Sequence, residues 1–221
     1  MIDFNNLISN YVKREIKEKT IGRYYPSEAG NCIRKVFYSY KNPKEVDLEL
    51  LKVFEAGNIL HEFIVNVLES EKNPQIELLE KESPFTLEVD DMTISGRVDD
   101  IVVVKVDNKV YLVEVKSTSS LKYTHEPHEA HIMQLQLYMH AKNIHNGMII
   151  YVERNTLQSK SFQLNYDIKG AEKAIKRLKD IHQCLKENKL PIPEARAVYA
   201  KGWMCKGCQY REECFKDTPH L

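Results

Sequence analysis

Two acidic residues and a lysine stand close together in one stretch, GRVDDIVVVKVDNKVYLVEVK, which begins at Gly96. Glu114 and Lys116 are two residues apart, so in a strand they point to the same face. Pairing with the preceding strand adds Asp99 to that face, roughly 7–8 Å from Glu114 at the backbone. Two carboxylates at this separation can share a Mg²⁺ or Mn²⁺ ion, and a neighbouring lysine can orient or deprotonate a water molecule. The pattern therefore indicates a divalent-cation site.

The turn between these two strands sets which residues lie opposite each other. A two-residue loop at Asp107–Asn108 is a hairpin signal, although a weaker one than Asn-Gly. With this loop, Asp99 opposes Lys116 and Asp100 faces the other side of the sheet. The same spacing also fits a solvent-exposed ladder of acidic and basic side chains. The apolar content of both strands favours burial on both faces instead.

A second group of reactive side chains stands in MCKGCQYREECF, where Cys205, Cys208 and Cys214 fall within ten residues. Three thiolates this close are typical of an iron or zinc site, which usually takes four ligands. Cys184 falls on the apolar stripe of a predicted helix and is interpreted as a structural thiol, which leaves Cys32 as the remaining candidate ligand. An odd number of cysteines and a charged N-terminus without an apolar core predict a cytoplasmic protein.

The composition bounds the class of protein. The chain has 221 residues, enough for one large domain or one domain with an appendage, and its 43% hydrophobic content fits a sizeable core. It has 32 basic and 32 acidic residues, so any nucleic-acid contact must come from local basic patches. No apolar run is long enough for a membrane helix. Side chains that can bind phosphates or stack on bases flank the cysteines: Arg34, Lys35, Tyr38, Lys201, Trp203 and Lys206.

The apolar periodicity predicts an α/β fold, in which helices flank a mixed β-sheet. An N-terminal helix is expected to about Lys19, and Asp47 is the predicted N-cap of a long helix. Pro191 and Pro193 are expected to stop the last helix. After a helix over 33–40, the order is helix, three strands, helix, two strands and helix, over residues 48–71, 83–89, 92–106, 109–116, 128–144, 147–154, 157–164 and 167–189.

These residues resemble the core of the PD-(D/E)XK nucleases in their RecB-like branch. The segments Gly96-Arg97-Val98-Asp99 and Glu114-Val115-Lys116 match its central motif. The branch adds a Gln-x-x-x-Tyr motif, here Gln134 to Tyr138, and a histidine on the preceding helix, here His61. One subfamily also has a single N-terminal cysteine, here Cys32, and a C-terminal trio. The joint pattern covers most of the chain and is similar to the CRISPR-associated RecB-like exonucleases.

The resemblance implies a restriction-endonuclease-like core and metal-dependent cleavage of DNA at free single-stranded ends. Lys116 would orient the attacking water or stabilise developing charge. Gln134 and Tyr138 would contact the nucleic-acid backbone near the metal, and His131 lies on the same side by spacing. The implied ligands of the Mg²⁺ or Mn²⁺ ion are His61, Asp99, Glu114 and the backbone carbonyl of Val115.

The resemblance also implies an iron–sulfur cluster, with Cys32, Cys205, Cys208 and Cys214 as its ligands. This one-plus-three arrangement fits a [4Fe–4S] cluster better than a zinc ribbon, while Zn²⁺ and a [2Fe–2S] cluster stay open. The expected cluster lobe joins an N-terminal helical segment (1–46) to a C-terminal cysteine-rich segment (191–221). The nuclease core (47–190) lies between them.

The implied biological role is trimming of spacer precursors in CRISPR adaptation, with DNA and the CRISPR integrase complex as partners and no membrane. One alternative is a subunit of that complex that recognises DNA ends and cuts weakly. Another is a RecB-like nuclease of a virus or a repair pathway.

Overall fold

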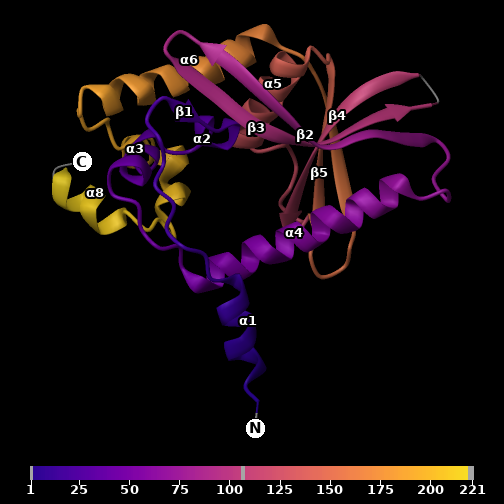
Figure 1. Ribbon diagram of the computed structural model, residues 1–221, viewed down its shortest axis with the longest axis horizontal. Coiled ribbons are helices and arrows are strands. Elements are labelled where there is room, and N and C mark those ends of the chain that lie inside the picture. The colour runs from indigo at the N-terminus through magenta and orange to yellow at the C-terminus, as the bar shows by residue number, and fades with distance from the viewer. Residues whose placement is uncertain (1, 106–107, 219–221) are drawn as a thin grey trace.

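A mixed β-sheet lies at the centre of the molecule, with helices on both of its faces (Figure 1). The structure is a computed structural model that describes residues 2–105 and 108–218, and the side chains of Val103 and Ala200 are outside that description. Within these residues the sheet has six strands in the order β1-β3-β4-β5-β6, with β2 paired to β3. The predicted α/β class with a mixed, helix-flanked sheet is therefore confirmed.

The elements follow the predicted order from the long helix onward. The strands are β1 (Arg23–Tyr24), β2 (Ile76–Val89), β3 (Met92–Val104), β4 (Lys109–Thr118), β5 (Asn146–Glu153) and β6 (Ser159–Asn165). The helices are α1 (Phe4–Val12), α2 (Pro26–Ala29), α3 (Ile33–Lys41), α4 (Leu48–Glu69), α5 (Glu129–Lys142), α6 (Ile168–Lys186), α7 (Glu194–Ala197), the 3₁₀ helix η1 (Tyr199–Cys205) and α8 (Arg211–Asp217).

Two features of the N-terminal segment differ from expectation. The first helix ends at Val12 rather than near Lys19. Residues 23–24 form a short strand that pairs in parallel with β3, so this segment contributes to the sheet as well as to the helices. None of the described helices is long and apolar enough to cross a membrane.

The β3–β4 hairpin has a longer turn than predicted. Val104 lies opposite Lys109, whereas a two-residue loop would place Val106 there, so the predicted register is wrong by two residues. Asn108 has a φ of 53°, and the predicted turn residue Asp107 lies outside the described residues. Because the error is an even number, each side chain keeps its predicted face.

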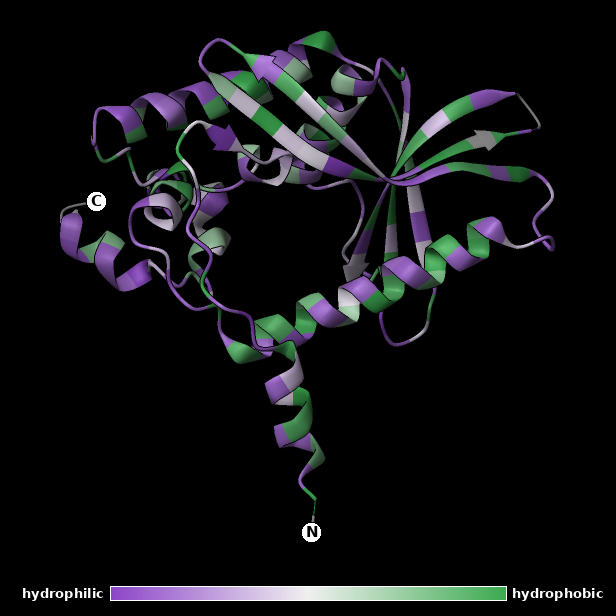
Figure 2. Cartoon of the chain, viewed as in Figure 1, coloured by the Kyte–Doolittle hydropathy of each residue, from purple (hydrophilic) through white to green (hydrophobic). Residues whose placement is uncertain are grey.

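The helices α4 and α5 cover opposite faces of the sheet. The N-cap of α4 is Asp47, as predicted, whose carboxylate accepts from the backbone amides of Glu49 and Leu50. Hydrophobic and hydrophilic residues alternate along α4 in Figure 2, and its apolar side packs on β3 and β4. On the other face, α5 is the crossover that the parallel β4–β5 pair requires.

The segment around Cys32 packs against the C-terminal part of the chain. The Arg34 guanidinium donates to the carbonyl of Pro191 at 2.7 Å, and the Tyr38 hydroxyl donates to Asp217 at 2.5 Å. The rings of Tyr38 and Tyr210 are stacked, with centroids 5.4 Å apart. In Figure 1 the yellow α8 accordingly lies beside the indigo α3.

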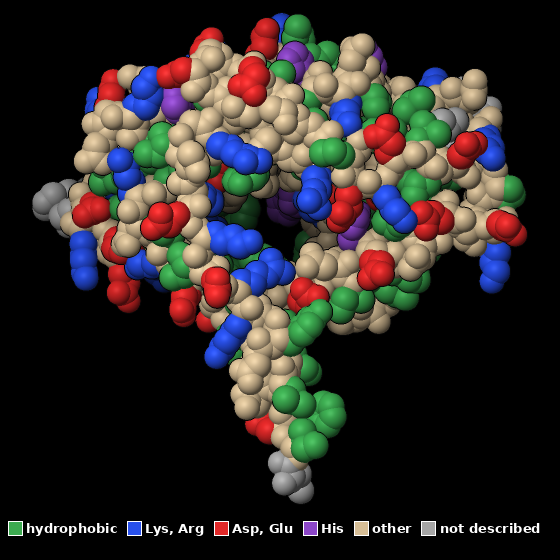
Figure 3. Space-filling model, in the orientation of Figure 1, with side chains coloured by type: hydrophobic (Ala, Val, Ile, Leu, Met, Phe, Trp, Pro, Cys, Tyr) green, Lys and Arg blue, Asp and Glu red, His purple; other side chains and the backbone are tan. Residues whose placement is uncertain are grey.

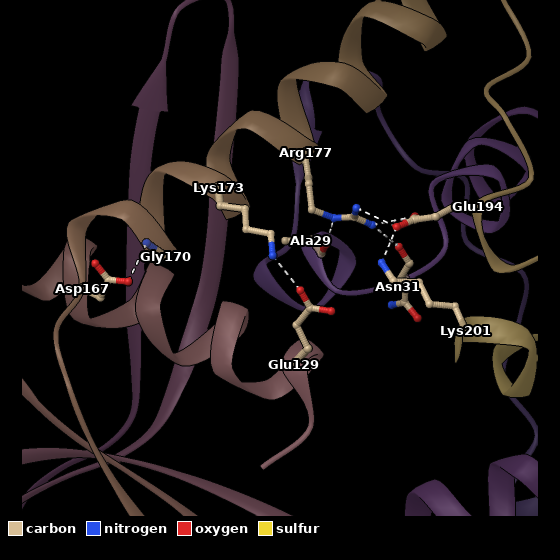
Figure 4. A network of polar contacts seen from close by, with 9 residues as sticks. All are labelled: Ala29, Asn31, Glu129, Asp167, Gly170, Lys173, Arg177, Glu194 and Lys201. Atoms are coloured by element: carbon tan, nitrogen blue, oxygen red, sulfur yellow. Dashed lines mark hydrogen bonds and ion pairs between the residues drawn. The ribbon is translucent and has the colours of Figure 1, made fainter. Parts of the chain in front are cut away.

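Arg177 of α6 ties the same regions together, as Figure 4 shows. Its guanidinium donates to the carbonyls of Ala29 and Asn31 and forms a two-pronged ion pair with Glu194, both N–O distances being 2.9 Å. Lys201 contacts the same Glu194 carboxylate at 2.5 Å. This Arg177 network therefore holds the residues just before Cys32 against the C-terminal segment.

A close approach at Gly30 brings the end of α2 onto the start of α5. A Cβ atom at this position would lie 2.4 Å from the Cα of Ala130, a distance that backbone atoms cannot tolerate. Only glycine allows this contact. As a result Cys32, two residues later, lies close to the helix that carries Gln134.

Candidate active site and cysteine cavity

Asp99 lies where the strands β3 and β4 separate. The last ladder pair between them is Asp100 with Val113, and beyond it the backbone amide of Val115 donates to Asp99 Oδ2 at 2.8 Å. The Asp99 carboxylate therefore accepts the hydrogen bond that the Val115 amide would donate to a backbone carbonyl in a continued ladder. The predicted pairing of Asp99 with Lys116 is wrong, because the ladder between the two strands ends with Asp100 opposite Val113.

Glu114 is fully buried beside this point. Its Oε1 accepts from the Gln134 amide at 2.7 Å and contacts the Lys116 ammonium, while its Oε2 has no hydrogen-bond partner among the described residues. Burial first, and then the neighbouring Asp99, raise the pKa of Glu114 to about 8, against the opposing effect of Lys116. A carboxylate that is this confined binds a cation or a proton readily.

The two carboxylates keep Lys116 charged. Burial lowers the pKa of Lys116, but Glu114 and Asp99 outweigh it and raise the pKa above its usual value. The Asp99 carboxyl also has a raised pKa, chiefly from burial, although Lys116 and the Val115 amide oppose that shift. The two neighbouring carboxylates thus favour the ammonium form of Lys116.

The backbone of Val115 and the imidazole of His61 complete this group. Both line the same cavity as Asp99 and Lys116. His61 reaches it from α4, and its Nε2 lies 3.6 Å from Oδ2 of Asp100 on the other side. Sequence reasoning left Asp100 out of the site; the one available signal was its position directly after Asp99.

These residues fit a hard divalent cation by their chemistry, since they offer carboxylate oxygens, an imidazole and a main-chain carbonyl. The Oε2 atom of Glu114 is buried and has no hydrogen-bond partner among the described residues, which also fits a bound cation. Among the residues that the structure describes, no three His, Cys, Asp or Glu side chains lie close enough together to hold one metal ion. The ligand set stays a prediction.

Gln134 and Tyr138 lie beneath the acidic pair. They are 7% and 5% exposed, and the Gln134 amide donates both to Glu114 and to the Tyr138 hydroxyl, at 2.7 and 2.9 Å. Gln134 Oε1 accepts from Lys116 at 3.4 Å. Their observed contacts orient Glu114 and Lys116, and the predicted contact with DNA stays a prediction.

Two adjoining cavities of about 570 Å³ each open over this site. They share Phe54, Lys116 and His131 in their walls, so the site lies at their junction. Figure 3 shows the corresponding hollow at the centre of the molecule, with Lys and Arg side chains gathered around it. The basic side chains in the two walls are Arg14, Arg97 and Arg154 in one, and Lys35 and Lys206 in the other, with Lys116 in both.

His131 and Trp203 are aromatic residues of these cavities. Burial, then Lys116 and His128, lower the pKa of His131 to about 3, so its ring is neutral, and it hydrogen-bonds to the Tyr151 hydroxyl at 2.7 Å. Trp203 is 53% exposed, lines the cavity with Lys35 and Lys206, and packs against His128. An exposed indole beside cationic groups can stack on a base.

The four cysteines predicted as iron–sulfur ligands all line a separate small cavity. Its walls include all four of Cys32, Cys205, Cys208 and Cys214, and all four thiols are free. Burial, and then these neighbouring thiols, raise the pKa of Cys205. Cys184 lies outside this cavity and packs against the core under α6, as predicted. The cysteine cavity adjoins the larger cavity lined by Lys35, Trp203 and Lys206, because Cys32 lines both.

Comparison with known proteins places the chain among nucleases. The family model described as the PD-(D/E)XK nuclease superfamily matches residues 27–215. No curated protein matches the sequence. The solved structure of SSO0001 is 22% identical, with 94% of each chain covered and a TM-score of 0.64.

The structure of LHK-Exo in complex with dAMP is 11% identical over 76% of this chain and 90% of that one, with a TM-score of 0.51. A second structure of LHK-Exo, an alkaline exonuclease from Laribacter hongkongensis, has the same identity and coverage and a TM-score of 0.49. At these identities the likeness is one of fold.

Proposed function

Because the chain belongs to the PD-(D/E)XK nuclease superfamily, we propose that it is a Mg²⁺- or Mn²⁺-dependent exonuclease that cuts DNA at single-stranded ends. The observation that carries this proposal is the cluster of Asp99, the buried Glu114 and Lys116: Glu114 contacts Lys116, Asp99 lines one of two adjoining cavities with basic walls, and Lys116 lines both. A single strand is narrow enough to follow such a groove, and Lys and Arg side chains neutralise its phosphates.

In the proposed site, Asp99, Glu114, His61 and the carbonyl of Val115 hold the cation. A bound Mg²⁺ or Mn²⁺ ion stabilises charge on the phosphate and lowers the pKa of a bound water. The Lys116 ammonium orients the water or stabilises the charge on the scissile phosphate, since the surrounding carboxylates keep it protonated. Gln134 keeps Glu114 in place through its amide.

The test is the cleavage of end-labelled single-stranded DNA by wild-type protein and by Glu114→Ala, with MnCl₂ or MgCl₂. We expect the variant to lose at least about 100-fold in rate, because the proposed ligand is removed. Circular single-stranded DNA should resist the wild type. A Glu114→Ala protein that cuts at the wild-type rate rules out this site.

A finer proposal rests on the resemblance to the CRISPR-associated RecB-like exonucleases. The protein would trim spacer precursors before integration, in the cytoplasm and in contact with the CRISPR integrase complex. Co-purification with the integrase, and cleavage that depends on it, would instead favour an end-recognising subunit with weak intrinsic activity. A RecB-like nuclease of viral or repair origin is the remaining alternative, and the genes beside its own would distinguish it.

The cysteine cavity supports a proposal about a second cofactor. Four free cysteines line one cavity, which is the number of thiolates that a [4Fe–4S] cluster or Zn²⁺ takes. As described, no three of them lie close enough together to hold one metal ion, so the proposal requires their side chains to move closer on binding. The proposed cluster joins the segments 1–46 and 191–221 around the core 47–190. Anaerobic purification with metal analysis tests it: about four irons and a brown colour support the cluster, and one zinc in a colourless protein rejects it.

A further inference from the structure

Asp100 is a buried carboxylate to which the proposed reaction gives no role. It is 0% exposed, like Glu114, and it sits in the central strand of the antiparallel β2–β3–β4 part of the sheet. Both of its side-chain oxygens are buried without a hydrogen-bond partner among the described residues. Buried carboxylates are normally paired, so this one calls for a partner.

The groups around Asp100 indicate which one could donate a hydrogen bond to its carboxylate. Its cross-strand neighbours are Lys81 on β2 and Val113 on β4. The Lys81 ammonium is 2.9 Å from Glu69 and is thereby drawn to the surface. The donor that approaches Asp100 is His61 Nε2 from α4, at 3.6 Å from Oδ2.

The two nitrogens of the His61 ring have different surroundings. Nε2 is buried and has no hydrogen-bond partner among the described residues, and the nearby Asp100 carboxylate lies slightly beyond hydrogen-bond distance from it. Nδ1 is not among the buried unpartnered atoms of the described residues, and the His61 side chain as a whole is 22% exposed. His61 lines the cavity beside Asp99, whereas Asp100 does not. One end of the ring thus faces the cavity and the other faces Asp100.

We infer that Asp100 is a positioning residue: it accepts the Nε2 proton of His61 and so presents Nδ1 to the cation of the active site. This inference rests on the proposed function, because it assumes a cation there. A neutral imidazole carries one proton, and a carboxylate at Nε2 fixes that proton away from the metal side. It also fixes the plane of the ring. The pair of adjacent aspartates then has two roles, with Asp99 facing the metal and Asp100 facing the histidine.

The first test measures Mn²⁺ binding by calorimetry, with no DNA present. Asp100→Asn should bind Mn²⁺ within a few-fold of wild type, because its amide oxygen still accepts from Nε2. Asp100→Ala should lose about 10- to 100-fold in affinity. Rescue by the asparagine variant separates positioning from direct ligation. If Asp100→Asn loses Mn²⁺ as completely as Glu114→Ala does, Asp100 is a ligand itself and the inference is wrong; unchanged affinity in Asp100→Ala also overturns it.

A second test reads the wild-type protein itself and needs a variant only to assign a signal. Long-range ¹H–¹⁵N spectra of the wild-type protein, with His61 assigned by His61→Gln, report which ring nitrogen carries the proton. We expect the Nε2–H form; an Nδ1–H form overturns the inference. This readout is independent of cleavage, so a protein that shows the Nε2–H form and binds Mn²⁺ but cuts no DNA would contradict the proposed function alone.

Discussion

At the scale of single residues, the surroundings of Lys116 favour the charged form of its side chain. It contacts Glu114, lies near Asp99 and donates to Gln134 Oε1, and although burial lowers its pKa, Glu114 and Asp99 raise that pKa above its usual value. In the proposed reaction its contribution is that of a positive charge and a hydrogen-bond donor. The spacing in the sequence left open whether this lysine would act as a base, and the two neighbouring acids favour its ammonium form.

Gln134 is predicted to matter for cleavage through Glu114. Gln134→Leu removes the amide that donates to Glu114 and Tyr138, and it removes an acceptor for Lys116. We expect a loss of about 1–3 kcal/mol in the free energy of unfolding, because buried partners are left unpaired. We also expect the cleavage rate to fall by at least about tenfold. Urea unfolding and end-labelled DNA measure the two effects.

Gln136 on the same helix is a matched control. It is 3% exposed and bonds to the carbonyl of Asn165 and the amide of Asp167, away from the acidic pair. Gln136→Leu should lose comparable stability but keep its cleavage rate. Equal losses of activity in both variants would show that Gln134 acts only through stability.

At the scale of elements, the 3₁₀ helix η1 brings an aromatic side chain to the groove. Trp203→Ala removes the exposed indole that lines the cavity with Lys35 and Lys206. Base stacking is worth about 1–3 kcal/mol, so we expect single-stranded DNA to bind about tenfold more weakly. Fluorescence anisotropy with a labelled oligonucleotide measures this. Tyr199→Ala, in the same helix and fully exposed at 102%, should bind as wild type does.

The sequence predicted these elements better than their registers. Alternation of β-branched residues located β3 and β4, and Asp47 located the start of α4, because these signals are local. The pairing of β3 with β4 depends on a turn whose length the residues Asp107–Asn108 do not specify. The short strand β1 was missed because two residues show no period, and it forms only through pairing with β3.

For the candidate site too, the sequence predicted some residues and missed others. Motif residues such as Glu114 and Lys116 were found from type and spacing, whereas the partners that tune them come from other elements. Asp100 is the clearest case, since its neighbour His61 is 39 positions away on α4 and only the packing of that helix brings them together.

For the whole molecule, the Arg177 network couples the two ends of the chain to pH. Burial raises the pKa of Glu194, but Arg177 and Lys201 outweigh it and lower the pKa from 4.5 to about 2. A carboxyl group whose pKa is lower in the folded state than in the unfolded state stabilises the fold at pH values above its unfolded pKa. That stability is lost as the pH falls from about 4.5 towards 2. We expect Glu194→Gln to be less stable than wild type by about 3 kcal/mol at pH 7, with a smaller difference at pH 4.

Urea unfolding at several pH values measures this difference. Glu129, which pairs with Lys173 at 2.7 Å in the same view of the structure, is the control because its side chain is 55% exposed (Figure 4). Glu129→Gln should change stability little at any pH, since exposed ion pairs are weak. A pH-independent loss in Glu194→Gln would contradict the assigned pKa.

The cysteine cavity gives a second prediction at this scale. Cys32→Ala should lose iron and lower the melting temperature by at least about 5 °C, because metal bonds would join its segment to the C-terminal trio. Cys184→Ala should keep both the iron and the melting temperature, since Cys184 lies outside the cavity. Iron analysis and thermal unfolding of both variants decide whether Cys32 is the fourth ligand.

The contacts between the two ends also impose an order on biosynthesis. Arg34 and Tyr38 find their partners at Pro191 and Asp217, which are 157 and 179 residues further along the chain. A ribosome makes the N-terminal segment first, so that segment leaves the exit tunnel long before its partners exist. Cys32 is therefore uncovered on the nascent chain and becomes enclosed only after synthesis has passed residue 217. Any metal that Cys32 shares with Cys205 can enter only after residue 205 has been made, about 170 residues after Cys32.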